Sequence, residues 1–292
     1  MFSGSLVALV TPMRPDGAVD FACLQRLVDW HIEQGTNGLV IAGTTGESAT
    51  LTRAEHIEVI RVAAARAAGR VPVIAGTGSN STAQTIDLSV AVGDAPIDGY
   101  LVVVPYYNKP TQEGLFRHFT AVADAVSKPV MLYNVPGRTV ADLLPATVAR
   151  LSSHPRIMGI KEATGDLSRA AAIRDLCGKD FALYSGDDAT TRDFILQGGQ
   201  GVVSVSANVA PAAMAAMCRA ALAGRQQAAA ELDAPLADLH RDLFLEANPI
   251  PVKWALAQMG LIPEGIRLPL TPLSAAAQAP VSAAMARAGL RR

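Results

Sequence analysis

Short runs of apolar, largely β-branched residues recur about every 20 to 35 residues along the chain, and amphipathic stretches separate them. This spacing is the length of a unit made of one strand and one helix. The runs are almost continuously hydrophobic, as expected for parallel strands that are covered on both faces. The predicted strands are Leu6–Val10, Gly38–Ala42, Val71–Ala75, Gly99–Val104, Val130–Asn134, Ile157–Lys161, Phe181–Ser185 and Gly201–Val205.

The stretches between these runs have the start signals and the periodicity of helices. Thr52 and Glu55 form a capping-box sequence, and an apolar stripe at helical spacing follows them. Asp166 is a suitable N-cap for another helix that ends at Cys177. Eight strand–helix units without a Gly-, Pro- or Ser-rich linker predict an α/β protein with a single (β/α)8 TIM barrel.

An open, doubly wound sheet that binds a dinucleotide is the alternative fold. Gly76 and Gly78 follow a predicted strand, but the third small residue and the acidic partner of the dinucleotide fingerprint are missing. From Pro211 onward the sequence is Ala-rich and predicts helices that are punctuated by prolines. We therefore expect the barrel in residues 1–224 and a C-terminal helical extension, packed on the barrel, in residues 225–292.

Composition narrows the possible function classes. The net charge of −1 gives no electrostatic reason to expect a nucleic acid or a membrane surface as a partner. No apolar run approaches the roughly 20 residues of a membrane-spanning helix, and the N-terminus lacks a signal-peptide pattern. The histidines and cysteines are not spaced as metal ligands. We expect a cytoplasmic protein that needs no metal and no cofactor.

Polar and glycine-rich segments follow several of the predicted strands. In a TIM barrel the carboxyl ends of the strands meet at one face, and that face carries the active site. We expect five segments to meet there: Gly43–Glu47, Pro105–Asn108, Tyr133–Thr139, Lys161–Glu162 and Gly186–Asp188.

Lys161 is the only one of the five lysines that lies inside a predicted strand. Alternation along this strand places Ile157, Gly159 and Lys161 on the face toward the barrel axis. Met158 and Ile160 are then predicted to face the surrounding helices. An apolar interior disfavours the charged form of an amine, and the neutral amine is the form that attacks a carbonyl in Schiff-base formation.

An ion pair with a buried carboxylate, such as that of Glu162, is the structural alternative for Lys161. Because Glu162 is the next residue, it is predicted to point to the opposite face, so we favour a nucleophilic role for Lys161. Tyr133 ends the neighbouring predicted strand. Its phenol can transfer the protons that imine formation requires, or it can be a core tyrosine whose hydroxyl is bonded to backbone.

Two further segments have the chemistry to bind carboxylates. Thr44, Thr45 and Gly46 precede a helix and combine exposed amide groups with two hydroxyls, although an ordinary glycine turn has the same sequence. Arg138 follows Pro-Gly at the predicted barrel mouth, where its planar guanidinium suits a substrate carboxylate. A solvated loop arginine is the alternative for Arg138.

Taken together, the motifs resemble those of the dihydrodipicolinate synthase and N-acetylneuraminate lyase family, which are pyruvate-dependent class I aldolases. The matching segments are ordered and span almost the whole chain. They are Gly43–Glu47, Tyr106–Pro110, Tyr133–Thr139, Ile160–Ala163, Ser185–Asp188 and Asn248–Lys253.

The resemblance implies a role for each candidate residue. Lys161 forms the imine with pyruvate, and Tyr133, Thr44 and Tyr107 relay protons, with Tyr107 reaching in from a neighbouring subunit. Substrate-binding positions are implied at Thr45 for the pyruvate carboxylate, at Arg138 for the carboxylate of L-aspartate 4-semialdehyde, and at Gly186 and the main chain of Val203 for the pocket wall. The implied assembly is a homotetramer built as a dimer of dimers, and the implied reaction is a step in lysine and diaminopimelate biosynthesis.

Two other functions remain open at this point. Another lyase of the same family could act on a sugar acid, but the sialic-acid lyases lack the Gly-Arg pair that is present here as Gly137-Arg138. A non-catalytic relative that only binds a metabolite is the other alternative, and the presence of Lys161, Tyr133 and Thr44 disfavours it.

The resemblance also bears on inhibition by L-lysine. Lysine-sensitive members bind the effector near the positions held here by Ser48, Ala49, Arg53, His56, Asn80, Gln84 and Tyr106. Sensitive enzymes carry a glutamate where this chain has Gln84. Because a neutral amide binds an ammonium group more weakly than a carboxylate does, we expect weak inhibition or none.

Overall fold

A computed structural model describes residues 2–290, and all eight predicted strands are present in a closed, parallel barrel in the order β1-β2-β3-β4-β5-β6-β7-β8. Strand β5 has the predicted bounds, and the ends of the others shift by at most two residues. The strands are β1 (Gly4–Ala8), β2 (Gly38–Ile41), β3 (Val73–Gly76), β4 (Gly99–Val103), β5 (Val130–Asn134), β6 (Ile157–Glu162), β7 (Ala182–Ser185) and β8 (Gly201–Ser204).

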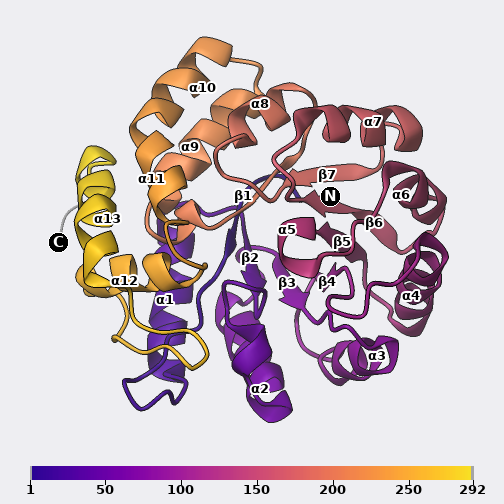
Figure 1. Ribbon diagram of the computed structural model, residues 1–292, viewed down its shortest axis with the longest axis horizontal. Coiled ribbons are helices and arrows are strands. Elements are labelled where there is room, and N and C mark those ends of the chain that lie inside the picture. The colour runs from indigo at the N-terminus through magenta and orange to yellow at the C-terminus, as the bar shows by residue number, and fades with distance from the viewer. Residues whose placement is uncertain (1, 291–292) are drawn as a thin grey trace.

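Helices surround the barrel, and Figure 1 shows that the short helix α5 lies over its centre. The helices up to β8 are α1 (Phe21–Glu33), η1 (Ser48–Thr50), α2 (Arg53–Ala67), α3 (Thr82–Ala91), α4 (Gln112–Ala125), α5 (Pro136–Thr139), α6 (Pro145–Ser152), α7 (Leu167–Cys177) and α8 (Thr191–Leu196). The predicted caps are confirmed, because Thr52 and Glu55 form a capping box on α2 and Asp166 caps α7.

Between β8 and residue 290 the chain forms helices joined by loops, with no further strand. They are η2 (Ser206–Asn208), α9 (Pro211–Leu222), α10 (Gln226–Asp233), η3 (Ala234–Leu236), α11 (Ala237–Asp242), α12 (Ile250–Gln258) and α13 (Ala275–Arg287). Helix α10 packs on α9, and α13 packs on α11 and α12, so these elements form the yellow and orange group at one side of the barrel in Figure 1. No helix within residues 2–290 has the length and apolarity needed to cross a membrane.

The buried side chains form two hydrophobic layers, one inside the barrel and one between the strands and the helices. Alternation along each strand divides its side chains between the two layers. The inner layer contains Leu6, Ala8, Val40, Ile74, Leu101, Met131, Tyr133, Val135, Ala182, Tyr184 and Val203. This packing makes the interior of the barrel largely apolar.

A bulge in β6 changes part of the predicted alternation. The pairing of β5 with β6 shifts register, so that Val130 lies opposite Ile157 but Met131 lies opposite Gly159. Ile157 therefore belongs to the outer layer, and Met158 packs against the inner layer, which contradicts the prediction for both residues. Beyond the bulge the prediction holds, because Ile160 is in the outer layer.

The C-terminal extension is attached to the turn that follows β2 by a buried ion pair. Lys253 on α12 pairs with Glu47, and both residues are almost fully buried. The second carboxylate oxygen of Glu47 accepts a hydrogen bond from the Arg267 amide at 3.2 Å. Glu47 has a left-handed backbone with φ of 57°, an unfavourable conformation for a residue with a side chain, so these contacts hold the turn in place.

The chemistry of this pair is set by burial. Removal from water lowers the pKa of Lys253, and the nearby carboxylate of Glu47 acts in the opposite direction. A buried pair adds little to stability as a whole, but removal of one partner leaves an uncompensated charge in an apolar environment. The two side chains therefore depend on each other.

We predict that Lys253→Met destabilises the fold by about 3–5 kcal/mol, because the Glu47 carboxylate is left buried without a partner. The double variant Glu47→Gln with Lys253→Met should recover a large part of this loss. Urea unfolding followed by circular dichroism at pH 7 measures both effects. Arg53→Met is the control, since its pair with Asp87 is more than half exposed and its loss should change stability far less than Lys253→Met does.

Candidate functional site

Lys161 and Tyr133 meet inside the barrel near the carboxyl ends of their strands. They are direct partners in the pairing of β5 with β6, and each is 6% exposed. The Lys161 ammonium nitrogen lies 4.2 Å from the centroid of the Tyr133 ring. The amine that the sequence singled out is therefore placed beside a phenol in an otherwise apolar interior.

Gly186 provides the space for the Lys161 side chain. A Cβ atom at position 186 would lie 2.9 Å from Cε of Lys161 and would also overlap Ala163. Val203 on β8 is 1% exposed and belongs to the same inner layer. Gly186 therefore lies directly against the lysine side chain, and Val203 belongs to the same inner layer of the barrel.

Glu162 does not pair with Lys161. Its side chain points to the other side of β6, where its carboxylate bonds Arg169 at 2.9 Å and Asn134 at 3.1 Å. Within residues 2–290, no carboxylate forms an ion pair with Lys161. The structural alternative of a Lys161–Glu162 pair is therefore wrong, and the amine faces the interior with no acidic partner in the described part of the chain.

The turn after β2 carries Thr44 and Thr45. Thr45 is buried, and its hydroxyl oxygen accepts a hydrogen bond from Nδ2 of Asn248 at 2.9 Å. Gly46 is packed tightly, since a Cβ atom there would lie 3.0–3.1 Å from the backbone of Ala42 and the carbonyl of Leu9. Thr44 is half-buried and lines the cavity described next.

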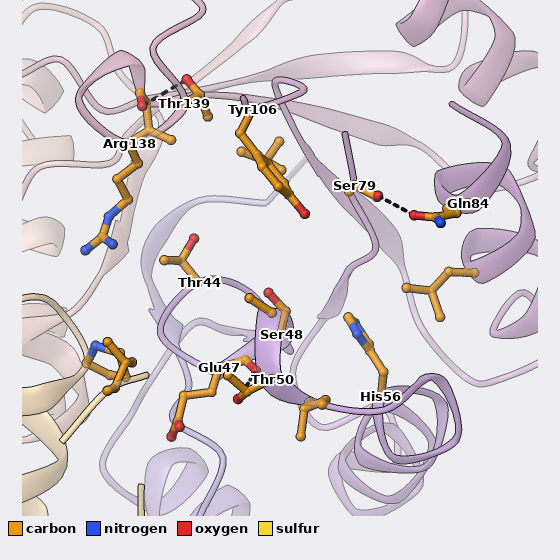
Figure 2. Close-up of a pocket in the computed structure, with 18 of the residues that line it drawn as sticks. Thr44, Glu47, Ser48, Thr50, His56, Ser79, Gln84, Tyr106, Arg138 and Thr139 are labelled. Atoms are coloured by element: carbon orange, nitrogen blue, oxygen red, sulfur yellow. Dashed lines mark hydrogen bonds between the residues drawn. The ribbon is translucent and has the colours of Figure 1, made fainter. Parts of the chain in front are cut away.

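A cavity of about 630 Å³ opens at the barrel mouth and extends toward α2 and α3. Figure 2 shows Thr44 and Arg138 on one side of this space, with His56, Ser79 and Gln84 on the other side and Tyr106 between them. The lining residues include Thr44, Glu47, Ser48, Ala49, Arg53, His56, Ser79, Gln84, Asp87, Tyr106, Val135, Arg138, Thr139, Asn248 and Pro249.

Arg138 lies on α5 at the edge of this cavity and is exposed. Its Nη2 donates to the main-chain carbonyl of Asn248 at 3.3 Å, which leaves most of its donors free. Asn248 therefore contacts both Thr45 and Arg138. We did not single out this residue by its chemistry, although the Asn-Pro-Ile-Pro sequence that begins with it was part of the matching motifs.

Tyr107 lies apart from the other candidate residues. It is 87% exposed, has a left-handed backbone with φ of 75°, and does not line the cavity of its own chain. Its neighbour Tyr106 does line the cavity. Of the candidate residues, Thr44 and Arg138 line this cavity, Lys161 and Tyr133 meet inside the barrel, and Tyr107 projects from the surface of its own chain.

His56 is the titratable group buried in the far wall of the cavity. Its Nε2 lies 2.7 Å from the carbonyl oxygen of Gly76, and burial lowers its pKa. The neutral ring is therefore favoured at neutral pH. In the part of the chain that the structure describes, no three His, Cys, Asp or Glu side chains are grouped as metal ligands would be.

Comparisons with known proteins agree with this arrangement. Residues 1–288 match the Dihydrodipicolinate synthetase family. The 4-hydroxy-tetrahydrodipicolinate synthase of Alcanivorax borkumensis is 62% identical over 290 residues, which are 99% of each chain. The enzyme of the same name from Methylococcus capsulatus is 60% identical over 99% of this chain and its whole length.

Solved structures of the same family superpose closely on this chain. The chloride-inhibited dihydrodipicolinate synthase from Acinetobacter baumannii, complexed with pyruvate, superposes with a TM-score of 0.98 at 52% identity over the full length of both chains. The dihydrodipicolinate synthase of Aquifex aeolicus gives 0.97 at 42% identity over 99% of each chain. The barrel, the internal lysine and these similarities together show that the chain belongs to the dihydrodipicolinate synthetase family.

Proposed function

We propose that this chain is a lyase with 4-hydroxy-tetrahydrodipicolinate synthase activity, which condenses pyruvate with L-aspartate 4-semialdehyde in lysine and diaminopimelate biosynthesis. The observation that carries the proposal is the placement of Lys161, whose amine lies against Tyr133 in an apolar interior and has no acidic partner among residues 2–290. Relatives about 60% identical over the whole chain bear the name of this activity, and a similar solved structure holds pyruvate.

The reaction begins when the neutral amine of Lys161 attacks the keto carbon of pyruvate and water leaves, which gives an imine. Loss of a methyl proton converts the imine to an enamine, whose carbon attacks the aldehyde of the second substrate. The amino group of that substrate then attacks the imine carbon, closes the ring and releases Lys161. No external oxidant, reductant or cofactor is required by this sequence of steps.

These steps move several protons, and three hydroxyls are assigned to carry them. The Tyr133 phenol is next to the amine, and Thr44 lies at the cavity edge between the strand ends and the solvent. We assign Tyr107 of a neighbouring subunit to the outer end of the relay. The arrangement would let a proton leave the buried imine without charging the apolar interior.

Two carboxylate sites complete the assignment. The hydroxyl of Thr45 accepts its hydrogen bond from Asn248, so its own hydrogen is free to be donated to the pyruvate carboxylate. Arg138 stands at the cavity mouth with free guanidinium donors for the carboxylate of the semialdehyde. Gly186 and the main chain of Val203 line the space around the reacting carbon.

A lyase that cleaves a sugar acid is the second candidate, because the same imine chemistry serves both reactions. The cationic guanidinium of Arg138 at the mouth favours a second substrate with a carboxylate over an uncharged polyol chain. A purely binding function does not account for an internal lysine that lies against Tyr133 and has no carboxylate partner within residues 2–290.

We predict that borohydride reduction in the presence of pyruvate adds one reduced pyruvyl group, located on the peptide that contains Lys161. Lys161→Ala should lose the label and most of the turnover, because the covalent route is removed. Arg138→Ala should keep the label but lose turnover with the semialdehyde, measured in an assay coupled to a reductase that consumes the cyclic product. Peptide mass spectrometry locates the label.

A label on the exposed Lys109 instead of Lys161, or none at all, would refute the Schiff-base assignment. Equal loss of trapping and turnover in Arg138→Ala would show that Arg138 has a structural role. Faster cleavage of N-acetylneuraminate than condensation of the semialdehyde would favour the sugar-acid lyase.

We also propose that the active assembly is a cytoplasmic homotetramer, a dimer of dimers in which Tyr107 completes the site of a partner. An aromatic side chain that is 87% exposed on a strained backbone is typical of an interface. Tyr106, the neighbour of Tyr107, lines the open cavity, and this cavity offers space for the Tyr107 side chain of a partner subunit.

If the site is shared, a 1:1 mixture of Tyr107→Phe and Lys161→Ala chains should recover up to about a quarter of the wild-type activity, since hybrid dimers contain one intact site. A mixture of Tyr133→Phe and Lys161→Ala is the matched control and should recover nothing, because both residues belong to one chain. The measurement is turnover after subunit exchange. Recovery in neither mixture, with exchange demonstrated, contradicts the shared site.

The outer part of the cavity bears on regulation by L-lysine. A relative from Cyanidioschyzon merolae, 42% identical, has been solved with lysine bound. In this chain Oε1 of Gln84 accepts a hydrogen bond from the Ser79 hydroxyl at 3.0 Å. Arg53 is paired with Asp87 at 2.7 Å, which offsets its charge. The main difference from the lysine-sensitive enzymes is therefore the amide of Gln84 in place of a carboxylate.

Inhibition by L-lysine should therefore be weak, and Gln84→Glu should increase it. A charged hydrogen bond is worth roughly 1.5–3 kcal/mol, which corresponds to about ten- to a hundredfold in affinity. Titration of lysine into the coupled assay measures both, with Gln226→Glu on α10, outside the cavity, as the control. Half-inhibition of the wild type at submillimolar lysine would contradict the expectation, and no gain in Gln84→Glu would contradict its explanation.

A further inference from the structure

Four polar side chains form a network on the outer side of β5 and β6, directly behind the lysine and the tyrosine. Arg169 on α7 binds Glu162 at 2.9 Å and Asp142 at 2.7 Å. Asn134 donates to Asp142 at 2.9 Å and to both oxygens of Glu162 at 3.1 and 3.3 Å. None of the roles assigned above uses these residues.

The network is buried, and each member depends on the others. Asn134 is fully buried, Glu162 is 3% exposed and the Arg169 side chain is 13% exposed, whereas the Asp142 side chain at the edge of the network is 34% exposed. Burial raises the pKa of Glu162, while the nearby Arg169 and the hydrogen bond from Asn134 act in the opposite direction. Such groups are costly to bury unless all of them are bonded, so the network accepts few geometries.

Two residues of the network are direct sequence neighbours of the lysine and the tyrosine. Asn134 follows Tyr133, Glu162 follows Lys161, and the two pairs lie in register across β5 and β6. Because successive residues of a strand point to opposite faces, fixing Asn134 and Glu162 outside also fixes the tyrosine and the lysine inside.

The same network reaches the segment that carries Arg138. Asp142 lies in residues 140–144, which follow α5 and lead to α6, and α5 carries Arg138. The Leu143 amide donates to Oδ1 of Asn134 at 2.9 Å, and Arg169 donates to the Leu143 carbonyl at 2.5 Å. The loop is therefore held to the strand ends by Asp142 and Leu143.

We propose that Asn134, Asp142, Glu162 and Arg169 are positioning residues that keep the Lys161–Tyr133 pair and the Arg138 loop in one fixed geometry. The inference rests on the proposed function, in which the pair forms the imine and Arg138 binds the second substrate. Within the network, Glu162 fixes the positions of β5 and β6, and Asp142 fixes the position of the loop that follows α5.

Two variants test the loop and the strands separately. Asp142→Asn should raise the KM for the semialdehyde about tenfold or more and leave the rate of borohydride trapping of pyruvate unchanged, since a small misplacement of a substrate-binding group is costly. Glu162→Gln should slow trapping by about tenfold. Asp94→Asn is the matched control, because it removes a carboxylate from the exposed Arg61–Asp94 pair and should change neither value.

Hydrogen–deuterium exchange supplies a readout that needs no activity. Asp142→Asn should speed exchange in the peptide containing the Leu143 amide, and Glu162→Gln should speed it at Thr164, whose amide donates to Glu162 at 3.0 Å. If either variant fails to fold, Arg169→Lys, which keeps the charge but not the bidentate geometry, should affect both peptides.

Equal effects of Asp142→Asn on trapping and on KM, or no effect on either, would overturn the proposal. Unchanged exchange in both peptides would overturn it as well. A wild type that fails to trap pyruvate would instead refute the proposed function, and exchange would then still decide whether the network holds the loop and the strands.

Discussion

Closure of the barrel between its first and last strands is the constraint on which the rest of the structure depends. Strand β1 pairs in parallel with β8, and Gly4 lies opposite Gly201. A Cβ atom at position 201 would overlap the backbone of Gly4, so the first pair of the seam requires glycine at position 201, while the pairs that follow carry side chains. Once the seam is closed, all eight strands point the same way, and their carboxyl ends form one ring around the candidate site.

The local parts of this arrangement could be predicted from the sequence. The strands, the capping box of α2 and the inward direction of Lys161 follow from periodicity, which is a property of neighbouring residues. The bulge in β6 reversed Ile157 and Met158, because a register shift depends on the partner strand and leaves no mark in the alternation of one strand. The lysine was unaffected, since it lies beyond the irregularity.

Contacts between distant segments could not be predicted in this way. Asn248 meets Thr45 and Arg138, and the charges of Glu47 and Lys253 neutralise each other, only because the extension folds back on the barrel. Glu162 illustrates the difference: alternation correctly turned it away from Lys161, but nothing in the pattern named Arg169 as its partner. Buried polar partners are decided by three-dimensional packing and not by spacing.

The attachment of the turn after β2 to the C-terminal helices has a consequence for how the protein is made. Asn248 and Lys253 follow their partners Thr45 and Glu47 by 203 and 206 positions. Translation proceeds from the N-terminus, so all eight strands leave the ribosome before the residues that hold this turn. A polypeptide released early could close its barrel and yet present an unanchored Thr44-Thr45 segment. The contacts that fix this turn are thus among the last that the growing chain can form.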